Sequence, residues 1–197
     1  RDWSSDVCSS DLSRGPVREA LARLEREGLV VIERHKGARI ASWGKNDVEE
    51  IFSLRLVLEQ LAIEWACKNA TATDVSVLES IVKEFRGLGD KQRTIKAVSK
   101  LDLEFHSAVF SAAHHDRLYR AWEILRSQIH SFLIYTWSRD ELTNKTWMTS
   151  WDKDHQIFVE IIKKRDVASG LKEIKAHMER GYNRVSKHFV GEEAVVL

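Results

Sequence analysis

Proline occurs once in this 197-residue chain, at Pro16, and glycine occurs only nine times. Both residue types end helices and shape turns, so their scarcity favours long helices and argues against a many-turned β-sandwich. Apolar residues make up 43% of the chain, which is enough for a sizeable core. No apolar run approaches the roughly 18 residues that a membrane helix needs. We therefore expect a mostly helical protein with no membrane span.

The first twelve residues, RDWSSDVCSSDL, show neither a helical nor a strand period. This string resembles the translation of a sequencing adapter, so we expect residues 1–12 to be a non-native segment and exclude them from the fold prediction. Cys8 lies in this string and Cys67 is the only other cysteine, so no disulfide framework is expected. With no secretory signal visible, these features predict a cytoplasmic protein.

Residues 13–45 predict a small winged unit, made of one helix followed by two short strands. The helix starts at the N-cap candidate Ser13 and stops at Gly28. Apolar residues recur along it at spacings of four and three, which predicts one buried stripe formed by Val17, Leu21 and Leu24. Segments 29–33 and 38–42 are apolar or β-branched enough to pair as strands, with the basic turn RHKG between them.

Positive charge is concentrated in this unit. Residues 13–45 carry eight Lys/Arg against four Asp/Glu, a balance of +4, whereas residues 46–197 carry 22 against 23, a balance of −1. A basic segment beside a near-neutral body is typical of a nucleic-acid reader joined to a sensing or assembly domain. A chance fluctuation of surface charge explains the balance equally well.

The candidate DNA contacts lie in the first turns of the helix and in the turn between the strands: Arg14, Gly15, Arg18, His35, Lys36 and Gly37. The two arginines lie one helical turn apart, and the glycine between them allows a close backbone approach to DNA. The basic turn can place a wing tip on the adjacent phosphates or in the minor groove. Arginines on an exposed helix more often form only a solvated face, so composition leaves both interpretations open.

From residue 46 onward the pattern is helical and predicts about six amphipathic helices. The first has an N-cap at Asn46 or Asp47 and reaches about Asn69. The others are expected near residues 73–88, 94–113, 116–139, 144–164 and 167–189. Short polar breaks join them, so we expect an antiparallel all-α bundle.

One carboxylate and three imidazoles of this bundle form a candidate metal site: Asp102, His106, His155 and His177. Asp102 and His106 are four residues apart, so their side chains project from one helical face. The other two histidines each lie on the apolar side of another expected helix. Side chains of facing bundle helices commonly assemble sites for Zn²⁺, Ni²⁺ or Mn²⁺. The alternative, and the more frequent case for any single histidine, is a hydrogen-bonded polar core.

The segment SRGPVREALARLEREGLV, the basic turn after it and the segment IFSLRLVLEQLAIEWA resemble the GntR family of bacterial transcription regulators, in its FadR-like branch. The resemblance implies a winged helix-turn-helix at 13–45 and a helical effector-binding domain, called FCD, at 46–197. It also implies DNA contacts by Arg14, Gly15, Arg18, His35 and Gly37, and metal ligation by Asp102, His106, His155 and His177. Family members carry two further helices before the SRGPVREAL segment, so we expect the winged unit to be truncated here and its DNA binding to be weakened.

These features favour a ligand-responsive transcription regulator over an enzyme. The helical domain would bind a divalent metal and a small organic acid, and a homodimer would read a double-stranded operator. The alternative is a metal-dependent hydrolase or lyase using the same four metal ligands. No additional general acid or base stands out for such an enzyme, and the basic segment would have no role in it. A helical effector-binding module without DNA function is a third interpretation, if the truncation is natural.

Arg55, in the string LRLVLE, is a candidate effector-binding residue. It resembles a position that faces the effector pocket in relatives and can pair with a carboxylate. An i,i+4 ion pair with Glu59 is an equally good interpretation of the same residue.

Overall fold

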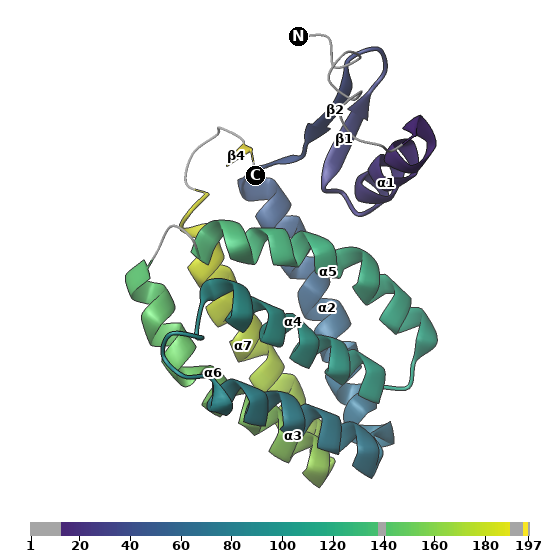
Figure 1. The fold of residues 1–197 in the computed structure, drawn as a ribbon. Coiled ribbons are helices and arrows are strands. Elements are labelled where there is room, and N and C mark those ends of the chain that lie inside the picture. Colours follow the sequence, from purple (N-terminus) through teal and green to yellow (C-terminus); the bar gives the residue numbers. More distant parts are fainter. Residues whose placement is uncertain (1–12, 138–140, 190–194, 197) are drawn as a thin grey trace.

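The structure, a computed structural model, describes residues 13–137, 141–189 and 195–196, so the suspected non-native segment 1–12 lies outside the described residues. Helix α1 (Arg14–Arg26) opens the described chain and is followed by the strands β1 (Val30–Glu33) and β2 (Gly37–Ile40). The strands form an antiparallel hairpin with Val30 opposite Ile40. Figure 1 shows α1 and the hairpin beside one end of the helical bundle. The predicted order of helix, strand, turn and strand is confirmed.

The apolar stripe predicted on α1 is not fully buried. Val17, Leu21 and Leu24 are each half-buried, and no residue of α1 is buried. Helix α1 packs mainly on β1, and a strand of four residues covers only part of a helix of 13. On the hairpin, Ile32 and Ile40 are 41% and 49% exposed. The winged unit therefore has little core of its own within the described residues.

Six helices form the bundle: α2 (Lys45–Asn69), α3 (Ala72–Gly87), α4 (Ile95–Ala112), α5 (Asp116–Trp137), α6 (Glu141–Lys164) and α7 (Val167–Ser186). Their number agrees with the sequence prediction, and their ends differ from it by a few residues. The cap of the first helix was predicted wrongly. Gly44 is the N-cap, and Asp47 lies inside the first turn, where its carboxylate accepts a hydrogen bond from the Gly44 N–H at 2.7 Å.

A second strand pair was not predicted from the sequence. Strand β3 (Ser42–Trp43) follows the hairpin, and strand β4 (Val195–Val196) lies near the other end of the chain. The two pair in antiparallel fashion, with Ser42 opposite Val196. The link between the winged unit and the bundle is therefore held by a strand from the far end of the chain.

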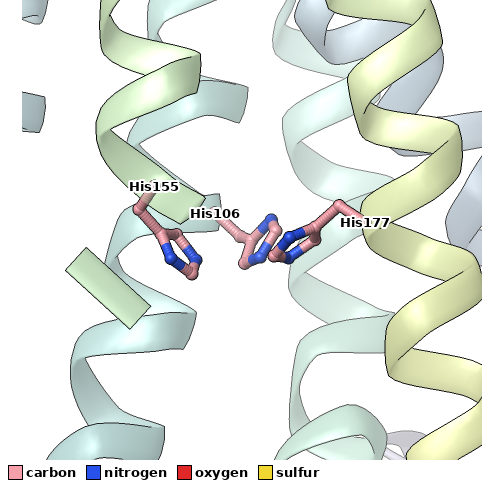
Figure 2. A group of neighbouring side chains, drawn as sticks. All are labelled: His106, His155 and His177. Carbon is pink, nitrogen blue, oxygen red and sulfur yellow. The ribbon is translucent and has the colours of Figure 1, made fainter. Parts of the chain in front are cut away.

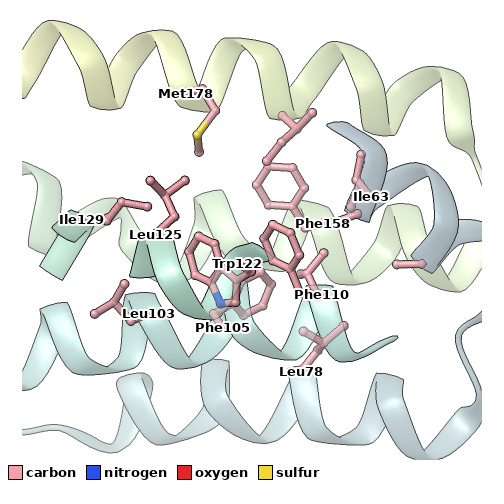
Figure 3. Close-up of a cluster of buried hydrophobic side chains, with 14 of the residues drawn as sticks. Ile63, Leu78, Leu103, Phe105, Phe110, Trp122, Leu125, Ile129, Phe158 and Met178 are labelled. Atoms are coloured by element: carbon pink, nitrogen blue, oxygen red, sulfur yellow. The ribbon is translucent and has the colours of Figure 1, made fainter. Parts of the chain in front are cut away.

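Aromatic side chains fill the middle of the bundle (Figure 3). Phe110 of α4 stacks on Trp122 of α5 with ring centroids 4.5 Å apart, and Phe105 meets Phe158 of α6 at 6.5 Å. Helices α2 and α7 run close together at Gly170, where a Cβ would lie 3.2 Å from the Ile63 side chain. The inner faces of α4, α6 and α7 also meet in this core. None of the described helices is long and apolar enough to cross a membrane.

Candidate functional site

Three buried imidazoles meet in the bundle. His106 comes from α4, His155 from α6 and His177 from α7, and Figure 2 shows the three rings in the space between these helices. One ring nitrogen from each lies within 4.8 Å of the others. The structure therefore brings together the three histidines that the sequence analysis selected from separate helices. Imidazoles at this spacing are a donor set suited to a borderline transition-metal ion.

A buried carboxylate orients His106. Its Nδ1 lies 2.9 Å from Oε1 and 3.0 Å from Oε2 of Glu59 on α2. Glu59 in turn accepts a hydrogen bond from Arg55 Nε at 3.1 Å, and both side chains of this pair are buried. Burial by itself would raise the pKa of Glu59, but His106 and Arg55 outweigh burial and lower it. An ionised carboxylate only accepts, so Nδ1 of His106 is the donor in this contact, and in the neutral ring the lone pair is on Nε2.

His155 is oriented by its own helix. Its Nδ1 lies 2.7 Å from the backbone carbonyl oxygen of Trp151, one turn earlier. A carbonyl oxygen only accepts, so Nδ1 is the donor and the lone pair of the neutral ring lies on Nε2. The Nε2 atom itself lies 3.2 Å from Oδ1 of Asp102. The Asp102 carboxylate also accepts a hydrogen bond from Trp151 Nε1 at 2.8 Å.

Charge in the cluster is arranged to suit a cation. Burial alone would raise the pKa of Asp102, but the contact with His155 and the charges of His106 and Arg55 hold it far below its usual range. Burial lowers the pKa of His177 well below its ordinary value, and the neighbouring histidines lower it further. The cluster therefore combines the ionised carboxylate of Asp102 with the neutral imidazole of His177. These are the protonation states in which both groups ligate metals.

The unsatisfied atoms of the cluster test whether the residues fit a metal ion. Nε2 of His106 and Nε2 of His155 are both buried and have no hydrogen-bond partner. Nε2 of His155 lies 3.2 Å from Oδ1 of Asp102, and both atoms are electron-rich. Two such buried atoms repel each other unless a cation lies between them, either a metal ion or an added proton. Ligands bound at about 2.1 Å to one ion lie roughly 3.0–3.4 Å apart at adjacent coordination positions. The three imidazoles therefore suit a divalent transition metal, and Asp102 lies within ligand spacing of one of them, His155.

Two residues that orient this cluster were not recognised as site residues from the sequence. Glu59 was considered only as the ion-pair partner of Arg55, and Trp151 was not selected. The available signal was a carboxylate at position 59 inside the mostly apolar string LVLEQLAIEWA, but the same string holds Glu64, which is not buried, so the pattern alone does not single out Glu59. For Arg55, the structure shows the ion pair with Glu59 that was the alternative to effector binding, and its guanidinium also lies 6.0 Å from the ring centroid of Trp122.

The candidate DNA contacts lie on the outside of the winged unit. Arg14, Gly15 and Arg18 are exposed in the first turns of α1. The turn between β1 and β2 is also exposed and carries His35 at φ 65° and Gly37 at φ 90°, both in the left-handed region. Lys36 lies between them, and its Nζ is 3.5 Å from the Glu33 carboxylate. The chain thus presents two basic surfaces, one on the helix and one on the hairpin tip.

Two family profiles match the chain. The FCD domain matches residues 50–180, and the family described as bacterial regulatory proteins, gntR family, matches residues 10–40. The first match covers more than half of the chain and contains all four candidate metal ligands. The second contains all the candidate DNA contacts.

Similar curated proteins are transcription regulators. The chain is 26% identical over 184 residues to the HTH-type transcriptional regulator YdhC of Bacillus subtilis. The match covers 93% of this chain and 80% of that protein. It is also 26% identical over 183 residues to the gluconate operon transcriptional repressor of Bacillus subtilis, covering 92% of this chain and 74% of the repressor. Among solved structures, McbR/YncC of E. coli superimposes with a TM-score of 0.78 at 18% identity, covering 90% and 82% of the two chains. This last similarity shows a shared fold.

Proposed function

Because the chain belongs to the GntR family of bacterial transcription regulators, with an FCD domain after its winged unit, we propose that a divalent metal and a small carboxylate effector control its binding to DNA. It is a DNA-binding transcription regulator of the GntR/FCD type. The family matches and relatives above are regulators, so the alternative of a hydrolase or lyase has no support among them. The metal, the effector and their effect on DNA binding form the proposal.

The observation that carries the metal proposal is the pair of buried, unpartnered Nε2 atoms of His106 and His155. In the proposed site these atoms, a ring nitrogen of His177 and the Asp102 carboxylate hold Zn²⁺, Ni²⁺ or Mn²⁺. The ion would supply a Lewis-acidic centre to which a carboxylate ligand can bind. Glu59 and the Trp151 carbonyl keep two of the imidazoles in the tautomer that ligation needs.

The effector class follows from the charge around the cluster. A divalent metal held by three neutral imidazoles and one carboxylate keeps a net positive charge, while the nearby charge of Arg55 on α2 is balanced by Glu59. A small organic acid is therefore the ligand that this environment would attract. The relative whose name refers to the gluconate operon supports the same class. Effector binding would change DNA affinity only if the acid has different affinities for two arrangements of the domains.

The DNA side of the proposal rests on the winged unit. Arg14 and Arg18 at the start of α1 would reach base edges in the major groove, and the tip formed by His35, Lys36 and Gly37 would contact the adjacent backbone. One recognition helix covers too few base pairs for operator-level affinity, so we propose a homodimer on a two-fold operator.

Metal analysis tests the proposal directly. Protein purified without chelator or affinity tag should contain close to one transition-metal ion per chain. Adding Zn²⁺, Ni²⁺ or Mn²⁺ to the stripped protein should raise the melting temperature, because the ion ties three helices together. At an ion concentration 100 times the dissociation constant, the expected stabilisation is about 2.7 kcal/mol.

A matched pair of histidine variants gives the control. His155→Ala should abolish both stoichiometric metal and the thermal shift. His114→Ala should retain both, because His114 is exposed and pairs with Asp74 at the start of α3. If stripped wild-type protein shows no thermal shift with any of the three ions and purified protein contains none of them, the four residues are a polar core and the metal proposal is wrong.

A further inference from the structure

A cleft between the winged unit and the bundle collects arginines from both. Helix α1 forms one wall and helix α5 the other, and Figure 1 shows α1 above α5 at this end of the molecule. The cleft has a volume of about 830 Å³, which is within the range of small-molecule sites. Its charged lining residues are Arg23, Arg26 and Glu27 at the end of α1 and Arg120, Glu123 and Arg126 on α5. Four arginines against two glutamates leave an excess of two positive charges in the cleft.

The arginines on the α1 side lie away from the proposed DNA contacts. At about 100° per residue, Arg23 is about 180° around the helix from Arg14, and Arg26 is about 120° from Arg14. The apolar stripe of α1 takes up a different side of the helix, because α1 packs mainly on β1. Contacts between DNA and the first turns of α1 therefore do not account for Arg23 and Arg26.

Most of this positive charge is not compensated within the chain. Nε of Arg23 pairs with the Glu27 carboxylate at 3.0 Å. Nε of Arg26 donates to a backbone carbonyl one turn earlier at 3.3 Å, which leaves its charge unpaired. Within the described part of the chain, Arg120 and Arg126 have no carboxylate at ion-pair distance. Like charges on two facing walls cost free energy unless an anion lies between them.

The chemistry of the cleft selects the class of anion. Guanidinium groups bind phosphate in a bidentate manner, and a phosphate monoester carries close to two negative charges at pH 7. This charge matches the excess of two positive charges in the cleft. Ile124 of α5 lines the same cleft and is 60% exposed, so an apolar surface lies beside the arginines. Inorganic phosphate would leave this surface in water, whereas a phosphate ester could cover it with its organic part.

We propose that the cleft between α1 and α5 binds a small organic phosphate. The phosphate group lies between the arginines of the two walls, and the organic part packs on Ile124. The cleft shares no residue with the histidine cluster, so this site is separate from the proposed metal and carboxylate site. The two units already touch at Gly28 and Gln128, and a ligand that bridges the walls would strengthen this contact. Occupancy of the cleft would thereby be coupled to the position of α1.

Isothermal titration calorimetry of the full chain tests the site, with phenyl phosphate as the probe. At low ionic strength the wild-type protein should bind phenyl phosphate with a dissociation constant below about 1 mM. Arg26→Gln on α1 and Arg126→Gln on α5 should each weaken binding about 5-fold to 20-fold, since each removes one guanidinium from a different wall. The matched control is Arg117→Gln, which replaces an exposed arginine of α5 outside the cleft and should bind within about twofold of wild type.

Two further variants separate a binding role from a structural one. Glu123→Gln should tighten binding about threefold, because it removes negative charge from the cleft. A substitution that only disturbed the fold would not improve affinity. Ile124→Ser should lower the affinity for phenyl phosphate toward that for inorganic phosphate. Circular dichroism verifies that each variant is folded.

The same titration on protein stripped of metal and then dialysed distinguishes the cleft from the histidine cluster. An unchanged affinity supports the cleft, and binding that disappears with the metal would place the phosphate on the metal and overturn the proposal. The proposal is also wrong if about 10 mM phenyl phosphate gives no saturable binding. Equal weakening by Arg117→Gln and Arg126→Gln would show attraction by overall charge and reject a defined site. Arginines that serve only the DNA backbone would give a further contrary result, in which the cleft variants weaken DNA binding but leave phenyl phosphate binding unchanged.

Discussion

Glu59 and His106 lie 47 residues apart in the sequence, yet the carboxylate of one is 2.9 Å from Nδ1 of the other inside the bundle. Both side chains are almost completely buried. A carboxylate behind an imidazole fixes the ring orientation, fixes the tautomer and raises the basicity of the opposite nitrogen. Helix α2 thus orients a member of the histidine cluster although it contributes none of the proposed ligands.

Replacing Glu59 should therefore weaken metal binding. Glu59→Gln removes the negative charge that holds the proton on Nδ1 of His106, and we expect metal affinity to fall about 10-fold to 100-fold. Competition with a chelator of known affinity measures this effect. The control is Glu104→Gln. Glu104 is partly exposed and pairs with Lys100, so this variant should bind metal as tightly as the wild-type protein does. A Glu59→Gln affinity within twofold of wild type would contradict the assigned role.

His130 should make stability depend on pH in a defined direction. Burial and the nearby charge of Arg126 lower the pKa of His130, whose buried Nε2 has no hydrogen-bond partner. Between this lowered pKa and the ordinary value near 6.5, the unfolded chain binds a proton that the folded protein does not bind. The free energy of unfolding should therefore fall as the pH falls through this window.

Urea denaturation at pH 7.5 and pH 5.5, in chelator so that the metal ligands carry no ion, measures this dependence. The variant His130→Asn lacks the titrating ring, so its stability should fall less between the two pH values than that of wild type. Equal losses for the two proteins would show that His130 does not contribute.

The two basic surfaces should affect DNA binding differently. Arg18→Ala removes a group proposed to contact base edges and should cost about 1–3 kcal/mol of specific affinity while relaxing sequence preference. Lys36→Ala removes a group proposed to contact phosphate, so it should weaken binding to all sequences alike and flatten the salt dependence. Fluorescence anisotropy of the natural full-length protein with operator and random DNA at several salt concentrations separates the two effects. If neither variant changes operator binding, the winged unit is not the reader.

The contact between the winged unit and the bundle depends on a glycine. Gly28 follows α1 with φ at 70°, and a Cβ on it would lie 2.5 Å from Nε2 of Gln128 on α5. Gly28→Ala combines the cost of a left-handed backbone with this clash, and we expect a loss of roughly 1–2 kcal/mol in stability. The double variant with Gln128→Ala should recover only the part that comes from the clash. Full recovery in a double-mutant cycle would show that backbone conformation contributes nothing.

The local features of the fold could be predicted from the sequence. The single proline, the polar breaks and the apolar periodicity determined the order of elements and the number of bundle helices, because helix formation depends on neighbours three and four residues away. The same rule predicted that Asp102 and His106 share a face, and it offered the Arg55–Glu59 pair as one of two interpretations of Arg55.

Only the tertiary structure decided which helices face one another. It placed Glu59 behind His106, and it placed Asp102 within hydrogen-bond distance of Trp151, 49 residues away. It also left the α1 stripe half-buried and paired β3 with β4 from the far end of the chain. Periodicity marks the apolar side of a helix but contains nothing about the element that covers it, because that choice depends on how all the side chains pack together in three dimensions.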